Sequence, residues 1–190
     1  MDYLDRPLAI TDIETTGLDA QRHEIIEIGL IVAKQKTLKI LDKFEVKIKP
    51  THIQTAQKKG LERNGYNEKE WRKAWDLKDA LEIYAEKAKN GIFVAQNAYV
   101  DWSFLAEAFK NTGVEDPTDY HRIDLFSVGW AMRNKFGLTK FSLSSMCKQL
   151  GIELEPMPHR AMNGAKKAYE ILNLFVQAQG GKGSGCQRKS

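Results

Sequence analysis

Cysteine, proline and long apolar runs are all scarce in this sequence. Its 190 residues contain two cysteines and five prolines. Two cysteines do not make a disulfide framework, so Cys147 and Cys186 are predicted to be unpaired thiols in a reducing compartment. The longest nearly unbroken apolar stretch, 28–33, is far shorter than the roughly 20 residues that a membrane helix needs. No secretory signal is visible at the start of the sequence, so we expect a soluble protein in the cytoplasm with no membrane partner.

The charge balance excludes a strongly acidic or strongly basic protein. The chain has 29 Lys and Arg residues against 25 Asp and Glu residues. The last eleven residues hold three of the basic residues and no acidic residue, so the remainder is almost neutral. We therefore expect one domain over 1–179, followed by a flexible, Gly-rich basic tail at 180–190.

Lysine is locally abundant between residues 34 and 59, where eight lysines face only Asp42 and Glu45. This stretch predicts one of two structures. It is either a positively charged face suited to a polyanion, or an edge strand whose lysines prevent pairing with another chain. Both interpretations fit the sequence.

Apolar periodicity predicts an α/β domain with a mixed β-sheet flanked by helices. Three extended runs in succession indicate an antiparallel meander, and the later strands, each followed by a helix, are typical of parallel strands. The expected strands cover 8–13, 24–33, 37–49, 92–96 and 121–124. The expected helices cover 68–89, 101–111 and 125–136, a segment capped by Ser142, and a final segment from Pro158 to about 177.

The acidic residues Asp12 and Glu14 follow the first apolar run. Because side chains alternate between the two faces of a strand, both carboxylates project to the same side. Two like charges side by side are unfavourable unless a cation lies between them, and oxygen ligands suit Mg²⁺ or Mn²⁺. The other interpretation is that both are ordinary polar residues on an exposed strand face. Thr15, Thr16 and Gly17 then form a turn whose backbone can approach a ligand closely.

Two further segments carry polar residues at the starts of helices. Asp101 stands where its carboxylate either caps a helix or turns into a cleft. His159 precedes the last helix and is either a surface residue or a general base beside a metal-bound water. Among the aromatic side chains near Asp101, an exposed Tyr99 or Trp102 could stack on a base, whereas Phe104 is expected in the core.

The three segments share their order and spacing with a known family. They contain D-x-E-T-T-G-L, N-x-x-x-D-x-x-F-L and H-R-A-x-x-x-A, beginning at Asp12, Asn97 and His159. Together they resemble the three motifs of the DnaQ-like, or DEDD, superfamily of 3′-5′ exonucleases. His159 makes the resemblance one to the histidine branch (DEDDh). The resemblance spans nearly the whole domain and implies a ribonuclease H-like fold.

The resemblance also implies a site and a reaction. Two divalent cations, Mg²⁺ or Mn²⁺, would clamp the terminal phosphodiester of single-stranded DNA or RNA, and the product would be a nucleoside 5′-monophosphate. Asp12, Glu14 and Asp101 would hold the cations, and His159 would remove a proton from water. The 3′-terminal nucleotide would be bound by residues of the first turn and of the second motif, namely Thr15, Thr16, Gly17, Leu18, Asn97 and Trp102.

One position departs from the family pattern. The family has a fourth aspartate five residues after the histidine, and this chain has Gly164 there. Glycine offers no side-chain oxygen, so a metal ligand and a negative charge are missing. The sequence leaves three interpretations open: a fold that binds 3′ ends without hydrolysing them, an enzyme disabled by substitution, and an active enzyme with a rearranged metal site. It also leaves open the preference for DNA or RNA, and whether the chain acts alone, as a homodimer or with a polymerase.

Overall fold

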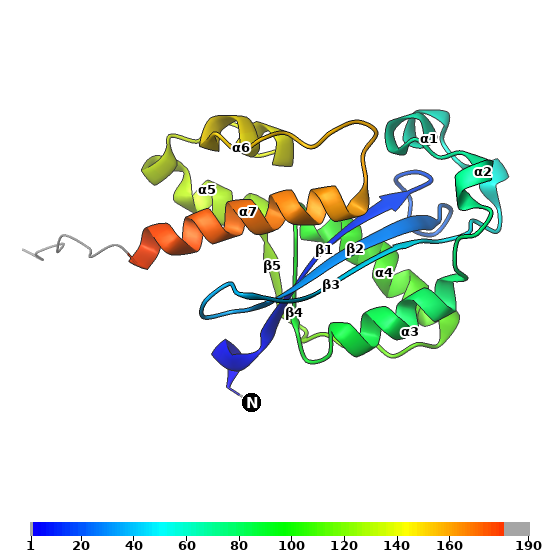
Figure 1. The fold of residues 1–190 in the computed structure, drawn as a ribbon, viewed down its shortest axis with the longest axis horizontal. Helices are drawn as coiled ribbons and strands as arrows, with labels where there is room; N and C mark the ends of the chain where they lie inside the picture. The colour runs from blue at the N-terminus through cyan, green and yellow to red at the C-terminus, as the bar shows by residue number, and fades with distance from the viewer. Residues whose placement is uncertain (1, 181–190) are drawn as a thin grey trace, which may run out of the picture.

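A mixed sheet of five strands forms the centre of the computed structural model, which describes residues 2–180 (Figure 1). The strands are β1 (Pro7–Thr15), β2 (Ile25–Lys34), β3 (Ile40–Lys47), β4 (Ile92–Ala95) and β5 (Arg122–Asp124). Their order in the sheet is β3-β2-β1-β4-β5. β2 pairs antiparallel with both β1 and β3, and β4 pairs parallel with both β1 and β5. The predicted antiparallel meander joined to parallel strands is confirmed.

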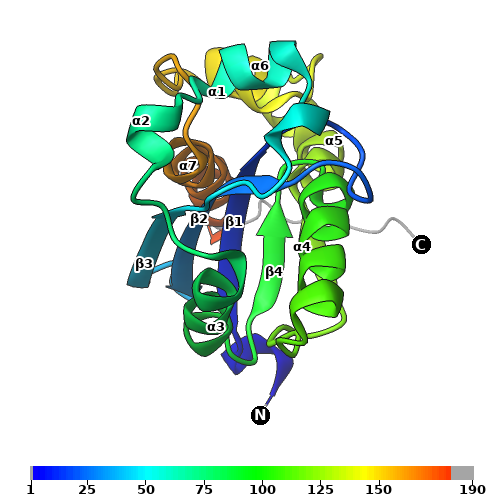
Figure 2. The same ribbon diagram turned by 90° about the vertical axis from the view of Figure 1, so that its right-hand side faces the viewer.

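Within residues 2–180, seven α-helices surround this sheet. They are α1 (Lys58–Asn64), α2 (Glu68–Trp71), α3 (Leu77–Lys87), α4 (Ala98–Thr112), α5 (Leu125–Phe136), α6 (Leu143–Leu150) and α7 (Ala161–Gly180). α7 lies along one face of the sheet, and α3 and α4 cover the other face (Figure 2). Short 3-10 turns occur at Tyr3–Asp5 and Ile53–Thr55.

Apolar clusters on the two faces hold these layers together. On one face, Ile10 of β1 and Val94 of β4 pack with the apolar side of α7. The buried residues of α7 include Ala161, Ala165, Ala168, Leu172 and Phe175. On the other face, Tyr84 of α3 and Phe104 of α4 are buried in a second cluster, so the expected core position of Phe104 is also confirmed.

β3 lies at an edge of the sheet, and charged side chains line it. Lys47 of β3 pairs with Glu70 at 2.7 Å, and Asp42 pairs with Lys87 at 2.6 Å. Charged side chains along an edge strand oppose its pairing with a second chain. The structure therefore supports the edge-strand interpretation of the lysine-rich stretch.

The single helix predicted over 68–89 is wrong, because the structure has two helices, α2 and α3, in its place. Trp75 interrupts the helical pattern by pairing with the end of β3. Its N–H donates to the Lys47 carbonyl at 2.9 Å, and its carbonyl accepts from the Lys49 N–H at 2.9 Å. Tertiary pairing of the backbone thus overrides an apolar periodicity that continues through the break.

The sequence reasoning also missed α1 and placed the start of α4 too late. α1 lies at the carboxyl end of β1, where the Asn64 side chain donates to the Thr15 carbonyl at 3.1 Å. α4 begins at Ala98 because Asn97 adopts a left-handed conformation and Asp124 accepts a hydrogen bond from the Ala98 N–H at 3.2 Å. Asp101 therefore lies within the first turn of α4, and the interpretation of it as a helix cap is wrong.

α7 approaches β2 closely at Gly29. A Cβ atom at this position would lie 2.5 Å from the carbonyl oxygen of Ala161, in the first turn of α7. Glycine permits a close approach of two backbones that a side chain would block. This contact sets the distance between α7, the helix that follows His159, and the sheet.

Three further expectations concern cysteine, the tail and membranes. Cys147 is buried and forms no disulfide within the described part of the chain, and Cys186 lies outside it. The tail predicted at 180–190 also lies outside the described residues, except for Gly180, which ends α7. None of the helices in residues 2–180 has the length and apolar character required to cross a membrane.

Replacing Gly29 with alanine is expected to destabilise the protein by about 1–3 kcal/mol, the usual cost of inserting an atom into a packed interior. The added methyl group would overlap backbone atoms of Ala161 and Met162, which cannot rotate away. Gly60→Ala in α1 is the control, because its Cβ would meet the Thr16 carbonyl oxygen at an ordinary 3.5 Å. Urea unfolding should show Gly60→Ala unchanged or up to about 1 kcal/mol more stable. Equal stability of the two variants would contradict the close approach of α7.

Candidate active site

The three predicted acidic residues converge at the carboxyl end of β1. Asp12 and Glu14 alternate with Ile13 along the strand and project to the same face. Asp101 comes from α4, which follows the parallel neighbour β4, and its Oδ1 accepts a hydrogen bond from the Ile13 N–H at 3.2 Å. Only 6% of Asp101 is exposed. Strand alternation and parallel pairing thus bring together three carboxylates that lie far apart in the sequence.

Among residues 2–180, no side chain neutralises these carboxylates directly, since none of Asp12, Glu14 and Asp101 forms an ion pair. Burial raises the pKa of Asp12 well above its ordinary value, and the charges of Asp101 and Glu14 raise it further. Burial also raises the pKa of Glu14 to about 8 and that of Asp101 to about 7. The site therefore favours a proton or a bound cation at these oxygens.

His159 lies beside this cluster, in the loop that leads into α7. One ring nitrogen of His159 and one oxygen each of Glu14 and Glu155 lie within 4.8 Å of one another. The structure thus places His159 next to one of the predicted metal ligands. The sequence reasoning missed Glu155, which lies in an irregular loop and belongs to none of the motifs. Its only signal was an acidic residue four positions before the histidine.

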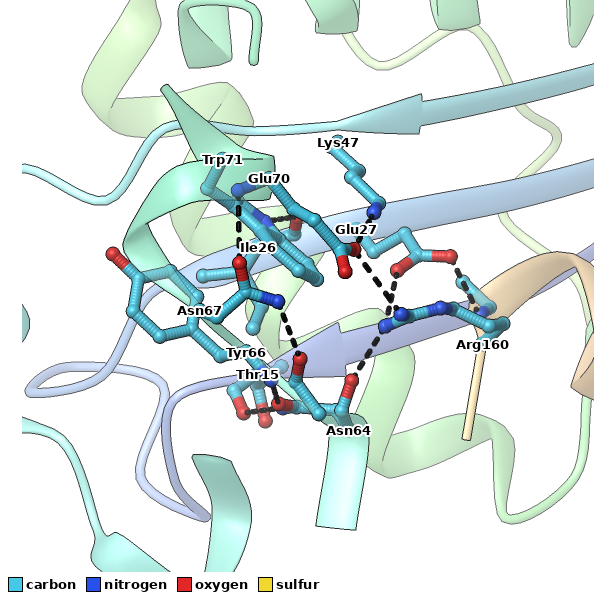
Figure 3. Close-up of polar contacts among 12 residues, drawn as sticks. Thr15, Ile26, Glu27, Lys47, Asn64, Tyr66, Asn67, Glu70, Trp71 and Arg160 are labelled. Atoms are coloured by element: carbon cyan, nitrogen blue, oxygen red, sulfur yellow. Dashed lines mark hydrogen bonds and ion pairs between the residues drawn. The ribbon is translucent and has the colours of Figure 1, made fainter. Parts of the chain in front are cut away.

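Arg160 connects the same loop to three other elements (Figure 3). Its Nη1 donates to the carbonyl oxygen of Asn64 in α1 at 2.6 Å, and its Nη2 lies 3.4 Å from Glu70 Oε2 in α2. Nη1 also lies 3.9 Å from Glu27 Oε2 in β2. Arg160 therefore fixes the backbone next to His159 against α1, α2 and the sheet.

Glu27 is a second acidic residue that the sequence reasoning missed. It is fully buried in β2, and its Oε1 accepts a hydrogen bond from the Ala161 N–H at 3.2 Å. A carboxylate is favourable at this helix N-terminus, which carries partial positive charge. Burial raises the pKa of Glu27 to about 7, although Arg160 lowers it. The signal was an acidic residue inside a continuous apolar run, because charged residues are rarely buried without a partner.

Gly164, which stands where the family has its fourth aspartate, faces the side chain of Asp12. A Cβ atom at position 164 would overlap the Asp12 carboxylate and lie 2.5 Å from its Cγ. Asp12 thus occupies space that any side chain at position 164 would enter. An aspartate at this position requires the Asp12 side chain to turn away from α7.

The turn that follows β1 is stabilised by hydrogen bonds within the protein. Thr15 Oγ1 donates to the Gly17 carbonyl at 2.7 Å, and Thr16 Oγ1 accepts from a backbone N–H at 2.8 Å. A Cβ atom at Gly17 would overlap the ring of His23. In contrast, 82% of Leu18 is exposed. The threonine hydroxyls are therefore engaged by the fold, whereas the Leu18 side chain is available to a ligand.

The second motif presents its aromatic side chains differently. Tyr99 is 83% exposed and lines a depression of about 440 Å³ together with Leu18. Trp102 is partly buried, and the Arg122 guanidinium lies over its ring, 3.6 Å from the ring centroid. Asn97 and Trp102 line a second depression of about 550 Å³, which Tyr99 also lines. Neither depression is lined by Asp12, Glu14 or His159.

The sequence of this chain matches a known protein family. The family model RNase_T, described as Exonuclease, matches residues 9–172, which contain all three motifs. The chain belongs to this exonuclease family. The predicted identity of a DnaQ-like 3′-5′ exonuclease family member with a ribonuclease H-like fold is confirmed.

The curated relatives of this exonuclease domain are much longer proteins. DNA polymerase III PolC-type of Thermotoga maritima is 30% identical over 175 residues, which make up 91% of this chain and 12% of that protein. The PolC-type polymerase of Caldanaerobacter subterraneus subsp. tengcongensis is 35% identical over 174 residues, again with 12% of its length covered. The chain therefore spans about 12% of the length of these relatives.

Solved structures share the fold of this exonuclease domain. E. coli exonuclease I in complex with a dT13 oligonucleotide has a TM-score of 0.77 and 17% identity, over 92% of this chain and 42% of that chain. The nuclease domain of 3′hExo, a DEDDh family member bound to rAMP, has a TM-score of 0.70 and 20% identity, over 93% and 94% of the two chains. Both similarities support the three-layer architecture.

The donor set of the exonuclease domain fits a divalent cation. Asp12, Glu14 and Asp101 offer carboxylate oxygens, the ligands that Mg²⁺ and Mn²⁺ prefer. Their charges are not balanced by ion pairs within the described residues. Gly164 leaves three motif carboxylates in place of the four of the family pattern.

A divalent cation is expected to raise the melting temperature of the protein, because it binds carboxylates that are gathered only in the folded state. At a concentration 100 times Kd, binding stabilises by about 2.7 kcal/mol, or roughly 5–10 °C for a chain of this size. Asp12→Asn should raise the melting temperature of the metal-free protein by relieving repulsion, and should abolish the rise caused by Mn²⁺.

Differential scanning calorimetry with and without Mn²⁺ measures both effects. Glu86→Gln is the matched control, because Glu86 is an exposed carboxylate on α3 that forms no ion pair within the described residues. It should leave the Mn²⁺ response unchanged. A full Mn²⁺ response in the Asp12→Asn variant would contradict the assignment of the site.

Proposed function

We propose that this chain is a metal-dependent 3′-5′ exonuclease that removes nucleoside 5′-monophosphates from single-stranded 3′ ends by a two-metal mechanism. One observation carries the proposal. In a chain of the exonuclease family, three carboxylates that form no ion pair with any described residue converge at the end of β1, beside a histidine in the loop before α7. Asp12, Glu14 and Asp101 are the proposed metal ligands, and His159 is the proposed general base.

Each proposed residue has a distinct task. Asp12 would be shared by both cations, Glu14 would hold the cation that activates water, and Asp101 would hold the other. Divalent cations supply, when bound, polarisation of the phosphate, activation of water and stabilisation of the leaving oxygen. The Ile13 N–H holds Asp101 in place, so this ligand is oriented before any cation binds.

His159 takes the proton in the hydrolytic step. The water oxygen forms a bond to the terminal phosphorus and transfers its proton to a ring nitrogen of His159. The bond between phosphorus and the 3′ oxygen of the preceding nucleotide then breaks, and that oxygen takes up a proton. The terminal nucleotide leaves with its phosphate at the 5′ position, and the shortened strand ends in a 3′ hydroxyl.

The substrate is proposed to be a single strand whose terminal base meets Leu18 and Tyr99. Both side chains are more than four-fifths exposed and line the same depression beside the start of α4. Thr15, Thr16 and Gly17 shape the turn that presents Leu18, and Asn97 and Trp102 line the second depression. The sequence relatives are DNA polymerases, which supports DNA as a substrate and a polymerase as a partner. One solved relative holds the ribonucleotide rAMP, which supports RNA.

Gly164 supports a second function on the same fold. With one motif carboxylate missing, two cations that repel each other are held less tightly. A chain that cannot hold both would bind 3′ ends without cutting them. The alternative function is therefore a catalytically inactive module for nucleic-acid 3′ ends.

An exonuclease assay decides between these functions. The full chain is incubated with 5′-labelled single-stranded DNA and RNA in Mg²⁺ and in Mn²⁺, and we expect products that shorten stepwise from the 3′ end. Asp12→Asn should lower the rate at least about 100-fold, because loss of even an indirect contact to a metal costs 10–100-fold. Glu62→Gln, an exposed acidic residue of α1, is the control and should keep the full rate.

The same assay with Gly164→Asp tests the alternative function. Binding without cleavage by the natural chain, together with cleavage by Gly164→Asp, would establish the binding module. Inactivity of both chains in Mg²⁺ and in Mn²⁺, without binding of 3′ ends, would contradict both proposed functions.

Tyr99→Ala is expected to raise KM for single-stranded DNA by about tenfold with little change in kcat, because stacking on an aromatic side chain contributes about 1–3 kcal/mol per base. Leu18→Ala should raise KM in the same direction. Tyr120→Ala is the matched control, since Tyr120 is 81% exposed but precedes β5, at the opposite end of the sheet from the acidic cluster. Steady-state kinetics measures all three. An equal effect at Tyr99 and Tyr120 would contradict the proposed path of the strand.

A further inference from the structure

Glu155 lies beside Glu14 and the proposed general base, His159. It belongs to the loop between α6 and α7, and only 11% of its side chain is exposed. Its Oε2 lies 2.9 Å from His159 Nδ1, and its Oε1 accepts a hydrogen bond from the Arg160 N–H at 3.0 Å. Both carboxylate oxygens therefore hold consecutive residues at the entry to α7.

The contact between Glu155 and His159 selects one form of the imidazole ring. An ionised carboxylate can only accept hydrogen bonds, so His159 Nδ1 must carry the proton. In the neutral imidazole, Nε2 is then left with its lone pair, which is what a general base needs. The link from Arg160 to α1, α2 and β2 keeps the backbone of this loop in place, so the ring has a fixed orientation.

Glu155 also brings a fourth carboxylate to the cluster. One of its oxygens lies within 4.8 Å of a Glu14 oxygen and of a His159 ring nitrogen. It reaches this place from the loop before α7, whereas the fourth acid of the family pattern would come from α7 itself at position 164. The space at position 164 is taken by Asp12. The number of carboxylates is therefore restored from a different backbone position.

We propose that Glu155 is the positioning residue for His159 and supplies the negative charge that the site lacks at Gly164. The inference rests on the proposed function, because it concerns the same metal site and the same general base. It goes beyond the family motifs, since none of them includes an acid at this position. Such a carboxylate would allow a site with Gly164 to hold cations.

Calorimetric titration of the full chain with Mn²⁺ tests whether the negative charge of Glu155 contributes to cation binding. Glu155→Gln keeps the size of the side chain and removes its charge, and we expect Mn²⁺ affinity to fall about 10–100-fold. Glu153→Gln is the matched control, because Glu153 is an exposed acid in the same loop. It should bind Mn²⁺ as the natural chain does. Equal affinities of the Glu155→Gln and Glu153→Gln variants would overturn the proposal, and so would a natural chain that binds no Mn²⁺.

A double-mutant cycle tests whether Glu155 replaces the missing aspartate. If Glu155 already supplies the charge that the missing aspartate would supply, Gly164→Asp raises Mn²⁺ affinity by a larger factor in the Glu155→Gln background than in the natural chain. The comparison of factors remains valid even if the overlap with Asp12 weakens binding in both backgrounds. An identical factor in the two backgrounds would overturn the replacement.

Nitrogen NMR of the His159 ring tests the positioning role without any metal or substrate. The natural chain should show a single tautomer with the proton on Nδ1, and Glu155→Ala should show a mixture. A mixture already present in the natural chain would overturn this role. Thermal unfolding of the variants confirms that they are folded.

The exonuclease assay separates this inference from the proposed function. A natural chain that binds Mn²⁺ with help from Glu155 but cuts nothing leaves the inference standing and overturns the proposed hydrolysis. A natural chain that cuts 3′ ends, with Glu155→Gln equally active and equally able to bind Mn²⁺, overturns the inference and leaves the proposed hydrolysis standing.

Discussion

Repulsion among carboxylates at the end of β1 is the constraint on which the rest of the site depends. Asp12, Glu14 and Asp101 converge without an ion pair in the described residues, and burial makes their charges costly. Such a cluster would separate if its backbone were free to move. It persists because β1 lies in the middle of the sheet and because Asp101 is hydrogen-bonded to β1 itself. We propose that a divalent cation is the partner that would turn this unfavourable arrangement into a favourable one.

The supporting structure around this cluster keeps the start of α7 in place. Gly29 lets the helix pack directly on β2, and the buried Glu27 accepts a hydrogen bond from its first turn. Arg160 then joins this turn to α1 and α2. Through these contacts with Arg160 (Figure 3), the two short helices support the backbone next to His159, although they supply none of the motif residues. A catalytic group needs such support because small displacements cost large factors in rate.

Much of the fold and most of the acidic cluster could be predicted from the sequence, for identifiable physical reasons. Strand alternation put Asp12 and Glu14 on one face, and the resemblance to the exonuclease family assigned Asp101 to the same site. Long-range contacts escaped prediction. Trp75 breaks a helix through backbone pairing with β3, and Glu155 reaches the cluster from an irregular loop. Neither contact leaves a periodic trace in the sequence, because each depends on which segments the fold brings together.

The direct measurement of the central claim is a crystal structure of the full chain grown with Mn²⁺, with anomalous scattering recorded at the manganese absorption edge. The account predicts anomalous density at the carboxylates of Asp12, Glu14 and Asp101, at distances typical of metal coordination. Manganese bound only elsewhere on the protein, or three carboxylates that face solvent separately, would contradict it.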